Sequence, residues 1–166
     1  MTGFRSARGA ALPAALLFLT FAAGAVQAQT AAASPFSISG DGQEVTDSRS
    51  GLVWRRCAEG LKWDGKTCAG KLAKFKLAGA KEAAKAAGGG WRLPTKDELV
   101  GLVVKGKKKP LIDDAAFPGT PKTLFWSTRP GFDDNLNAWL VNFSNGKVDG
   151  NSGAGKFALR LVHAKP

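Results

Sequence analysis

The sequence predicts an α+β domain in which two short helices from the middle of the chain pack on an antiparallel sheet. Three observations lead to this fold class. Residues 88–99 end one helix and begin another, and the segments on either side alternate apolar and polar residues as strands do. Asn145-Gly146 is the strongest sequence signal for a two-residue hairpin turn. Helices in the middle with strands at both ends are typical of α+β domains, and we expect the terminal strands to be adjacent.

The first 28 residues have the pattern of a secretory signal peptide. Arg5 and Arg8 precede an apolar run over 14–23, and Val26-Gln27-Ala28 has small residues at the cleavage spacing. The apolar run is too short to span a bilayer as a helix. We therefore expect an exported protein, periplasmic or extracellular, with no membrane span.

Removal of 28 of the 166 residues leaves 138, which is enough for one domain with a core. Residues 29–35 are alanine-rich and predict a disordered leader, so the single domain is expected over 36–164. The expected signal peptide carries two arginines and no acidic residue, so the formal net charge falls from +11 to +9 on cleavage. The oligomeric state is left open by the sequence.

The N-terminal part of the domain has the composition of short strands. Residues 36–47 predict edge strands broken by a turn at 40–42, and the turn cluster at 46–51 leads into Leu52-Val53-Trp54. This pattern predicts a hairpin that closes on a core tryptophan.

Cys57 and Cys68 are the only cysteines. In an exported protein the expected state is a disulfide, and two free thiols are the alternative. Zinc is not expected, because the only histidine, His163, is distant in the sequence. A disulfide closing so short a loop stabilises a domain by roughly 2–3 kcal/mol.

The first helix is predicted by alanines at i, i+3, i+4 and i+7, namely Ala80, Ala83, Ala84 and Ala87. Lys81 and Lys85 lie on its other side, and Gly88 to Gly90 end it.

The second helix is predicted by Thr95 and Glu98, which have the spacing of a capping box. Leu99, Leu102 and Val103 would face inward, and the helix would end near residues 105–106. Ahead of the cap, Trp91 is expected to turn into the core.

The chain after Pro110 has β character. Residues 125–127, 138–143, 147–148 and 157–163 predict strands, and within 138–143 the side chains of Trp139, Val141 and Phe143 share one face.

The order of these motifs resembles the family named for the C-terminal domain of the Legionella collagen-like protein. The most specific part of the resemblance is Gly90-Trp91-Arg92-Leu93-Pro94-Thr95, and the likeness covers 36–163. It implies a C-type lectin-like fold, related to the formylglycine-generating enzymes. The founder of the family is an adhesin that binds sulfated glycosaminoglycans. This chain lacks the collagen-like stalk and the Glu-Pro-Asn and Trp-Asn-Asp elements of lectin-type calcium sites.

The densest cluster of positive charge lies at Lys105, Lys107, Lys108 and Lys109. Five further lysines could extend it into one basic face, namely Lys71, Lys74, Lys76, Lys81 and Lys85. Such a face attracts polyanions through its field and through counterion release. Acidic or sulfated polysaccharide is the expected partner of an exported protein, with nucleic acid as the second class. The alternative is that these lysines only keep the domain soluble.

Two further features are candidates for a ligand site. Asp133, Asp134 and Asn135 offer oxygen ligands for calcium, although turn chemistry explains the same residues and no cofactor is expected. Trp63 lies between the cysteines and could stack on a sugar ring, although core filling is the expected role. The other four tryptophans, Trp54, Trp91, Trp126 and Trp139, are expected to pack in the core.

No nucleophile has a recognisable base and orienting acid near it in the sequence, so no enzyme is expected. Carrying the thiol chemistry of the formylglycine-generating enzymes onto Cys57 or Cys68 has no motif support. The resulting hypothesis is an exported, non-catalytic module that binds acidic or sulfated glycans. A structural or protein-interaction domain of the cell envelope, with no glycan ligand, is the competing hypothesis.

Overall fold

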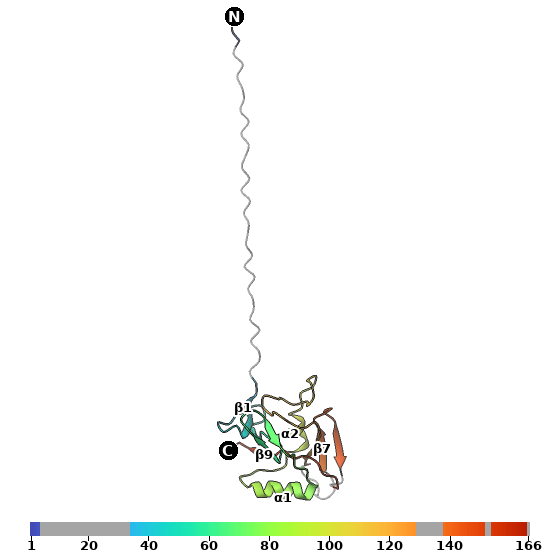
Figure 1. Cartoon of the computed structure of the whole chain (residues 1–166). Coiled ribbons are helices and arrows are strands. Elements are labelled where there is room, and N and C mark those ends of the chain that lie inside the picture. The colour runs from blue at the N-terminus through green and yellow to red at the C-terminus, as the bar shows by residue number, and fades with distance from the viewer. Residues whose placement is uncertain (4–33, 129–137, 152–153, 166) are drawn as a thin grey trace. The chain divides into compact units, whose positions relative to one another are not determined.

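The computed structural model describes residues 1–3, 34–128, 138–151 and 154–165. The chain divides into two units, Met1–Ala32 and Ala33–Pro166, and every helix and strand below belongs to the second (Figure 1). Its elements are β1 (Phe36–Ile38), β2 (Glu44–Asp47), β3 (Leu52–Arg55), β4 (Leu61–Trp63), β5 (Cys68–Gly70), α1 (Leu77–Ala87), α2 (Lys96–Val100), β6 (Leu124–Ser127), β7 (Ala138–Asn142), β8 (Val148–Asn151) and β9 (Val162–Ala164). The fold is α+β with antiparallel strand pairing, as predicted.

Both ends of the domain meet in one four-stranded sheet of order β1-β2-β3-β9. The predicted hairpin is β2–β3, in which Val45 pairs with Trp54, and its tight turn closes with the Gly51 N–H donating to the Asp47 carbonyl at 2.9 Å. The expectation that the terminal strands are adjacent is wrong. β1 occupies the free edge of β2 through its own hairpin, so β9 adds to β3 and the two terminal strands lie at opposite edges.

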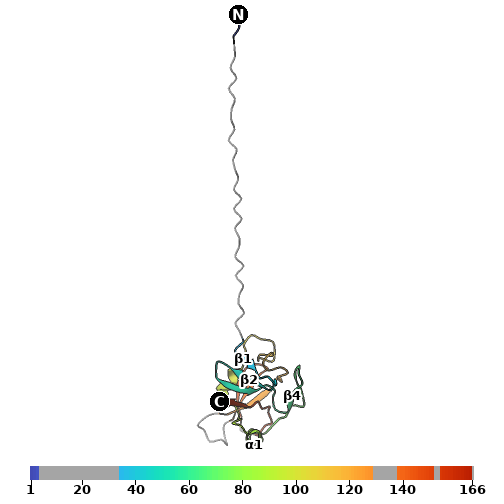
Figure 2. The same ribbon diagram turned by 90° about the vertical axis from the view of Figure 1, so that its left-hand side faces the viewer.

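Two smaller sheets complete the domain. β4 and β5 form a two-stranded hairpin, which projects from the side of the domain in Figure 2, and β6, β7 and β8 form a three-stranded sheet in that order. The Asn145-Gly146 turn connects β7 to β8 as predicted, with Gly146 at a φ of 73°. The loop has four residues rather than two, because the Asn142 N–H donates to the Lys147 carbonyl at 2.9 Å and closes the ladder there.

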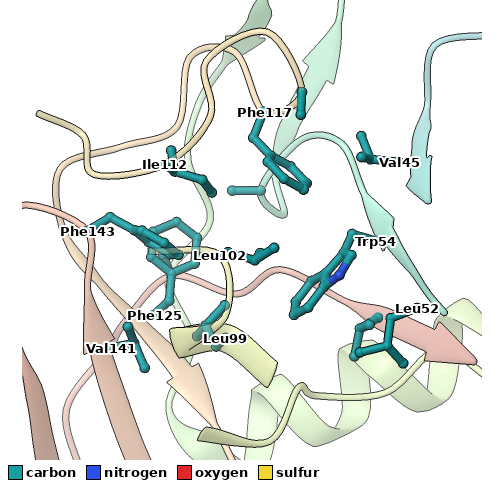
Figure 3. Close-up of a cluster of buried hydrophobic side chains, with 14 residues drawn as sticks. Val45, Leu52, Trp54, Leu99, Leu102, Ile112, Phe117, Phe125, Val141 and Phe143 are labelled. Carbon is teal, nitrogen blue, oxygen red and sulfur yellow. The ribbon is translucent and has the colours of Figure 1, made fainter. Parts of the chain in front are cut away.

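The β6–β7 pair lies between two hydrophobic clusters, because successive residues of a strand face opposite sides. Phe125, Val141 and Phe143 belong to the first cluster, whereas Trp126 and Leu140 belong to the second. Figure 3 shows the first cluster, in which β2, β3, α2 and residues 112–117 surround Trp54. α1 covers the second cluster with Leu77, Ala80 and Ala84.

The tryptophans divide into two groups. Trp54 and Trp126 are 1% and 0% exposed, as core packing predicts. Trp91 and Trp139 are only half-buried. Trp91 packs against the second cluster from outside, so the expectation of full core burial is wrong for it.

Both helices differ in extent from the prediction. α1 begins at Leu77, three residues before the first alanine of the expected pattern, and Ala87 is exposed. α2 ends at Val100 rather than near 105, because the Leu102 and Val103 N–H groups donate to carbonyls three residues back. These tighter turns still bury Leu102 in the first cluster.

The capping box that begins α2 is formed as predicted. The Glu98 N–H donates to Thr95 Oγ1 at 3.2 Å, and the Thr95 N–H donates to the Glu98 carboxylate at 2.7 Å. In the part of the chain that the structure describes, no helix has the length and apolarity needed to cross a membrane.

Candidate functional site

The predicted disulfide is present. Cys57 and Cys68 are joined with a Cα–Cα distance of 5.4 Å, and there are no free cysteines. The bond ties the segment that follows β3 to the start of β5, directly opposite Trp63 in the β4–β5 register. It therefore fixes the β4–β5 hairpin to the four-stranded sheet.

Trp63 is half-buried on this hairpin, and Arg56 covers one face of its ring. The Arg56 guanidinium carbon lies 3.7 Å from the ring centroid, and a Cβ on Gly42 would lie 2.6 Å from the indole Nε1. Arg56 is itself 7% exposed and donates to the Ala116 carbonyl at 3.2 Å. At most one face of the Trp63 ring is left to stack on a ligand.

A pocket of about 180 Å³ lies beside the disulfide. It is lined by Gln43, Arg55, Cys57, Ala58, Glu59, Leu61, Ala87 and Leu161. The pocket thus lies between the segment after β3 and the C-terminal end of α1, and its wall combines three polar side chains with aliphatic ones.

Glu59 is the carboxylate of this pocket. No other side chain or backbone group of the described ranges donates a hydrogen bond to its carboxylate or forms an ion pair with it. Its backbone is fixed, because the Glu59 N–H donates to the Leu159 carbonyl and the Glu59 carbonyl accepts from the Ala73 N–H, both at 2.9 Å. Burial raises the pKa of Glu59, while the charges of Arg55 and Arg160 act in the opposite direction.

Arg160 lies in the core, is 1% exposed, and acts on Glu59 through its charge. Its guanidinium donates to the carbonyls of Arg55, at 2.7 Å, and of Arg56, and to Thr120 Oγ1 at 2.8 Å. Burial lowers the pKa of Arg160 to about 9, which leaves it charged at neutral pH. It holds the backbone of residues 55–56, from which the pocket wall is built.

Arg55 also lines the pocket, and its guanidinium lies over the ring of Trp91. Its guanidinium carbon lies 4.3 Å from the Trp91 ring centroid. The rings of Trp91 and His163 pack edge to face, with their centroids 4.4 Å apart. The Arg55 N–H donates to the Leu161 carbonyl at 3.0 Å. The tryptophan of the Trp-Arg-Leu-Pro-Thr run thus positions a pocket arginine rather than filling the core.

The lysine loop, residues 105–109, is held at its base. The Val104 N–H donates to the Leu111 carbonyl at 3.0 Å, and the Leu111 N–H donates to the Phe143 carbonyl at 2.8 Å. Lys105, Lys108 and Lys109 are exposed, and Lys107 lies 3.5 Å from a carboxylate oxygen of Asp114. The loop therefore presents positive charge on a fixed base beside the β7–β8 turn.

The structure does not bring the loop lysines together with Lys81 and Lys85. Those two belong to α1, whose cluster includes Ala138 at the start of β7, whereas the loop is bonded to Phe143 just beyond the end of β7. In Figure 1, α1 lies at the end of the domain away from the β7–β8 turn. The loop and the α1 lysines therefore lie in separate regions. Lys71, Lys74 and Lys76 lie in the segment between β5 and α1, and Trp63 lies on the β4–β5 hairpin.

The calcium candidates Asp133, Asp134 and Asn135 lie outside the described residues. Among the residues that are described, no group of three or more His, Cys, Asp or Glu side chains could hold a metal ion.

The pocket residues Gln43, Arg55 and Glu59 are absent from the sequence-based candidates. The one signal that could have indicated them is the charged run Arg55-Arg56-Cys57-Ala58-Glu59 around a disulfide cysteine. Charged side chains next to a structural bridge have no spacing rule that separates a pocket from a solvated surface.

Comparison with known proteins bears on the whole domain. No curated protein matches the chain. The model of the Lcl C-terminal domain family matches residues 43–163. This range contains β2 to β8, the disulfide, the capping box and the pocket. The chain therefore belongs to the Lcl C-terminal domain family, as its Trp-Arg-Leu-Pro-Thr run predicts.

Proposed function

We propose that this protein is an exported, non-catalytic module that binds acidic or sulfated glycans through its lysine loop. The observation that carries the proposal is the loop itself, which places four lysines within five residues and fixes their backbone at the base. The side chains of three of them are exposed, and a single carboxylate, that of Asp114, pairs with the fourth. Because the two ends of the loop are held together, it loses less backbone entropy when a ligand binds than an untethered segment would.

The chemistry of the loop fits a polymeric anion. Lysine ammonium groups act as compact point charges without the planar fork of arginine, so they favour attraction over bidentate recognition. Binding of this kind is driven in large part by release of counterions from the polyanion. We expect broad selectivity among sulfated and uronic polysaccharides, with Trp63 as a secondary contact.

Export through a signal peptide at residues 1–28 and a lectin-like relationship of the α+β domain are parts of the same proposal. Both support a ligand met outside the cytoplasm, where acidic polysaccharides are abundant and nucleic acid is not the main polyanion. Neither a metal nor another cofactor is needed for binding by the loop.

The test is the affinity for heparin as a function of salt concentration. The variant replaces Lys105, Lys107, Lys108 and Lys109 with glutamine. Its matched control replaces four exposed lysines outside the candidate basic face, Lys62, Lys66, Lys156 and Lys165, with glutamine. Both variants lose the same charge. We expect the loop variant to bind at least about tenfold more weakly than the control and with a shallower salt dependence.

Equal affinities for the two variants would show that only net charge matters and would remove the loop from the site. If the wild-type protein does not bind heparin at physiological salt, the glycan proposal is wrong and the structural or protein-interaction role is favoured. Thermal unfolding of all three proteins checks that the substitutions leave the fold intact.

A further inference from the structure

The pocket beside the disulfide is built from parts that hold their positions without a ligand. Arg55 and Arg56 are fixed by backbone bonds to Leu161 and Gln43, at 3.0 and 2.9 Å, and Glu59 is fixed through both its N–H and its carbonyl. Cys57, which is joined to Cys68 by the disulfide, lines the same pocket. Such a pocket needs little reorganisation to accept a ligand.

The polar side chains of the pocket are not matched to one another. Arg55 and Glu59 carry opposite charges, yet no ion pair joins them within the described residues, and the guanidinium of Arg55 is held by the ring of Trp91 instead. A half-buried carboxylate without a hydrogen-bond donor costs stability. Glu59 can therefore accept, and Arg55 can donate, a hydrogen bond to a molecule in the pocket that both residues line.

We propose that this pocket binds one neutral, polyhydroxylated ring of the size of a single sugar residue, which donates hydroxyl hydrogen bonds to Glu59 and accepts from Arg55. This site is separate from the lysine loop and goes beyond the function proposed above. Gln43 can both donate to and accept from a hydroxyl, and Leu61, Leu161 and Ala87 offer aliphatic contact to the C–H face of a ring.

The size of the pocket limits its occupant. Its volume of about 180 Å³ is below the range of about 300–1,000 Å³ that is usual for drug-sized ligands. One six-membered ring fits that limit, whereas a folded peptide or a longer oligosaccharide would have to leave most of its surface outside.

The charges of the pocket select against ionic ligands. A cation next to Glu59 would also face Arg55 and the buried Arg160, and an anion next to Arg55 would face Glu59. A neutral hydroxyl-bearing ring avoids both costs, because each hydroxyl donates to one partner and accepts from another.

The experiment is ligand-observed NMR by saturation transfer, with the folded protein and single compounds as probes. The neutral probes are glucose, galactose and mannose, and the ionic probes are glucuronate and free glycine. We expect saturation transfer to at least one neutral sugar, with a dissociation constant on the order of 1 mM, as suits a small ring with few polar contacts.

Two pocket variants and one matched control separate the site from the rest of the surface. Glu59→Gln keeps the shape of the side chain and removes its charge, and Arg55→Met keeps the stem on Trp91 and removes the donors. Both are expected to weaken binding at least about tenfold, the usual effect of losing a hydrogen bond to a charged group. Glu82→Gln, an exposed residue outside the pocket, makes the same chemical change and should bind as the wild type does.

The lysine-loop variant tests whether monosaccharide binding in the pocket is independent of the heparin binding proposed for the loop. It should bind the monosaccharide as the wild type does but bind heparin more weakly. Glu59→Gln should bind heparin as the wild type does but bind the monosaccharide more weakly. Saturation transfer to glucuronate or glycine in place of the neutral sugars, no transfer to any neutral sugar, or unchanged binding by both pocket variants would overturn the proposal. Glu59→Gln should unfold at a temperature no lower than wild type, because burial disfavours the charge that it removes.

Discussion

One buried arginine, Arg160, holds the backbone of residues beside the pocket from within the core. Among the described residues no carboxylate lies at hydrogen-bond distance from Arg160. Its guanidinium donates to backbone carbonyls and Thr120, and its carbon lies 4.8 Å from the centroid of the Phe117 ring. The two carbonyls belong to Arg55 and Arg56, which carry the pocket wall and cover Trp63. Removing the donor leaves buried acceptors without partners, which costs more than the bond itself contributes.

We therefore expect Arg160→Met to destabilise the domain by about 3 kcal/mol, since a side chain of similar length fills the space but satisfies none of the three acceptors. Urea denaturation monitored by tryptophan fluorescence measures the change. Lys156→Met, at an exposed position, is the control and should change stability by only a few tenths of a kcal/mol. A variant at 160 as stable as this control would contradict the role given to the arginine.

Trp91 gives a second test at this scale. Because its indole is half-buried, we expect Trp91→Ala to cost about 2 kcal/mol, less than the roughly 3–5 kcal/mol of a fully buried large aromatic residue. Chemical denaturation of Trp91→Ala beside Trp126→Ala, at a position that is 0% exposed, measures the difference. Equal losses would place the indole in the core after all.

At the scale of elements, α2 depends on its first turn. The helix has only five residues, too few to be stable by propensity, so its cap and the packing of Leu99 and Leu102 must hold it. Glu98 serves twice, since its carboxylate accepts from the Thr95 N–H and also from Arg92 at 2.7 and 2.8 Å. The cap is thereby joined to the strand-like entry that carries Trp91.

Thr95→Ala removes one half of this arrangement, because the Glu98 N–H loses its acceptor. We expect a loss of about 1 kcal/mol in the free energy of unfolding, whereas Thr95→Ser, which keeps the hydroxyl, should lose much less. Urea titrations of both variants provide the comparison. If serine and alanine were equally destabilising, the hydroxyl would not be the stabilising group.

The carboxylate of Glu98 also predicts a pH dependence. Burial alone would raise its pKa, but the bonds from Arg92 and Thr95 outweigh burial and hold the pKa of Glu98 below its usual value of 4.5. A lowered pKa contributes stability that is present above the unfolded value and is lost as pH falls through the folded one. The difference in unfolding free energy between wild type and Glu98→Gln should therefore be largest near neutral pH and shrink below about pH 4.5. Parallel stability curves for the two proteins would contradict this.

At the scale of the whole molecule, the lysines of the loop and those of α1 lie near opposite ends of β7. The five residues of that strand span roughly 16 Å, whereas charges are screened over about 8 Å at physiological ionic strength. Charges this far apart do not act as one patch on a short ligand. The loop and α1 therefore offer a polyanion separate contact regions, of which the loop is the denser.

We therefore expect the effects of the two regions on heparin affinity to add. The loop variant and a Lys81→Gln/Lys85→Gln double variant should each lower log affinity, the loop more strongly, and the combined variant should lose the sum within about 0.3–0.5 kcal/mol. Titration of one heparin preparation against the four proteins tests this. A combined loss much larger or smaller than the sum would indicate that the two regions act as one site.

Local features could be predicted from the sequence because their causes lie within a few residues. The capping box at Thr95, the β2–β3 hairpin and the Asn145-Gly146 turn each arise from neighbouring backbone groups and side chains. The disulfide needed only the count of cysteines and the expectation of export. Helix ends were less certain, because α2 stops where tighter turns bury Leu102 equally well.

The sequence by itself thus determined the α+β class, the family, and the local turns and helix cap of the chain. Only the tertiary structure decided which strand β9 joins, how far the two groups of lysines lie apart, and that Arg55 and Glu59 face one pocket. Those facts depend on contacts between residues far apart in the chain, such as Glu59 with Leu159 and Arg160 with Arg55. The free energy of such contacts depends on the burial of both partners at once. The periodicity of one segment gives no information about the burial of a distant partner.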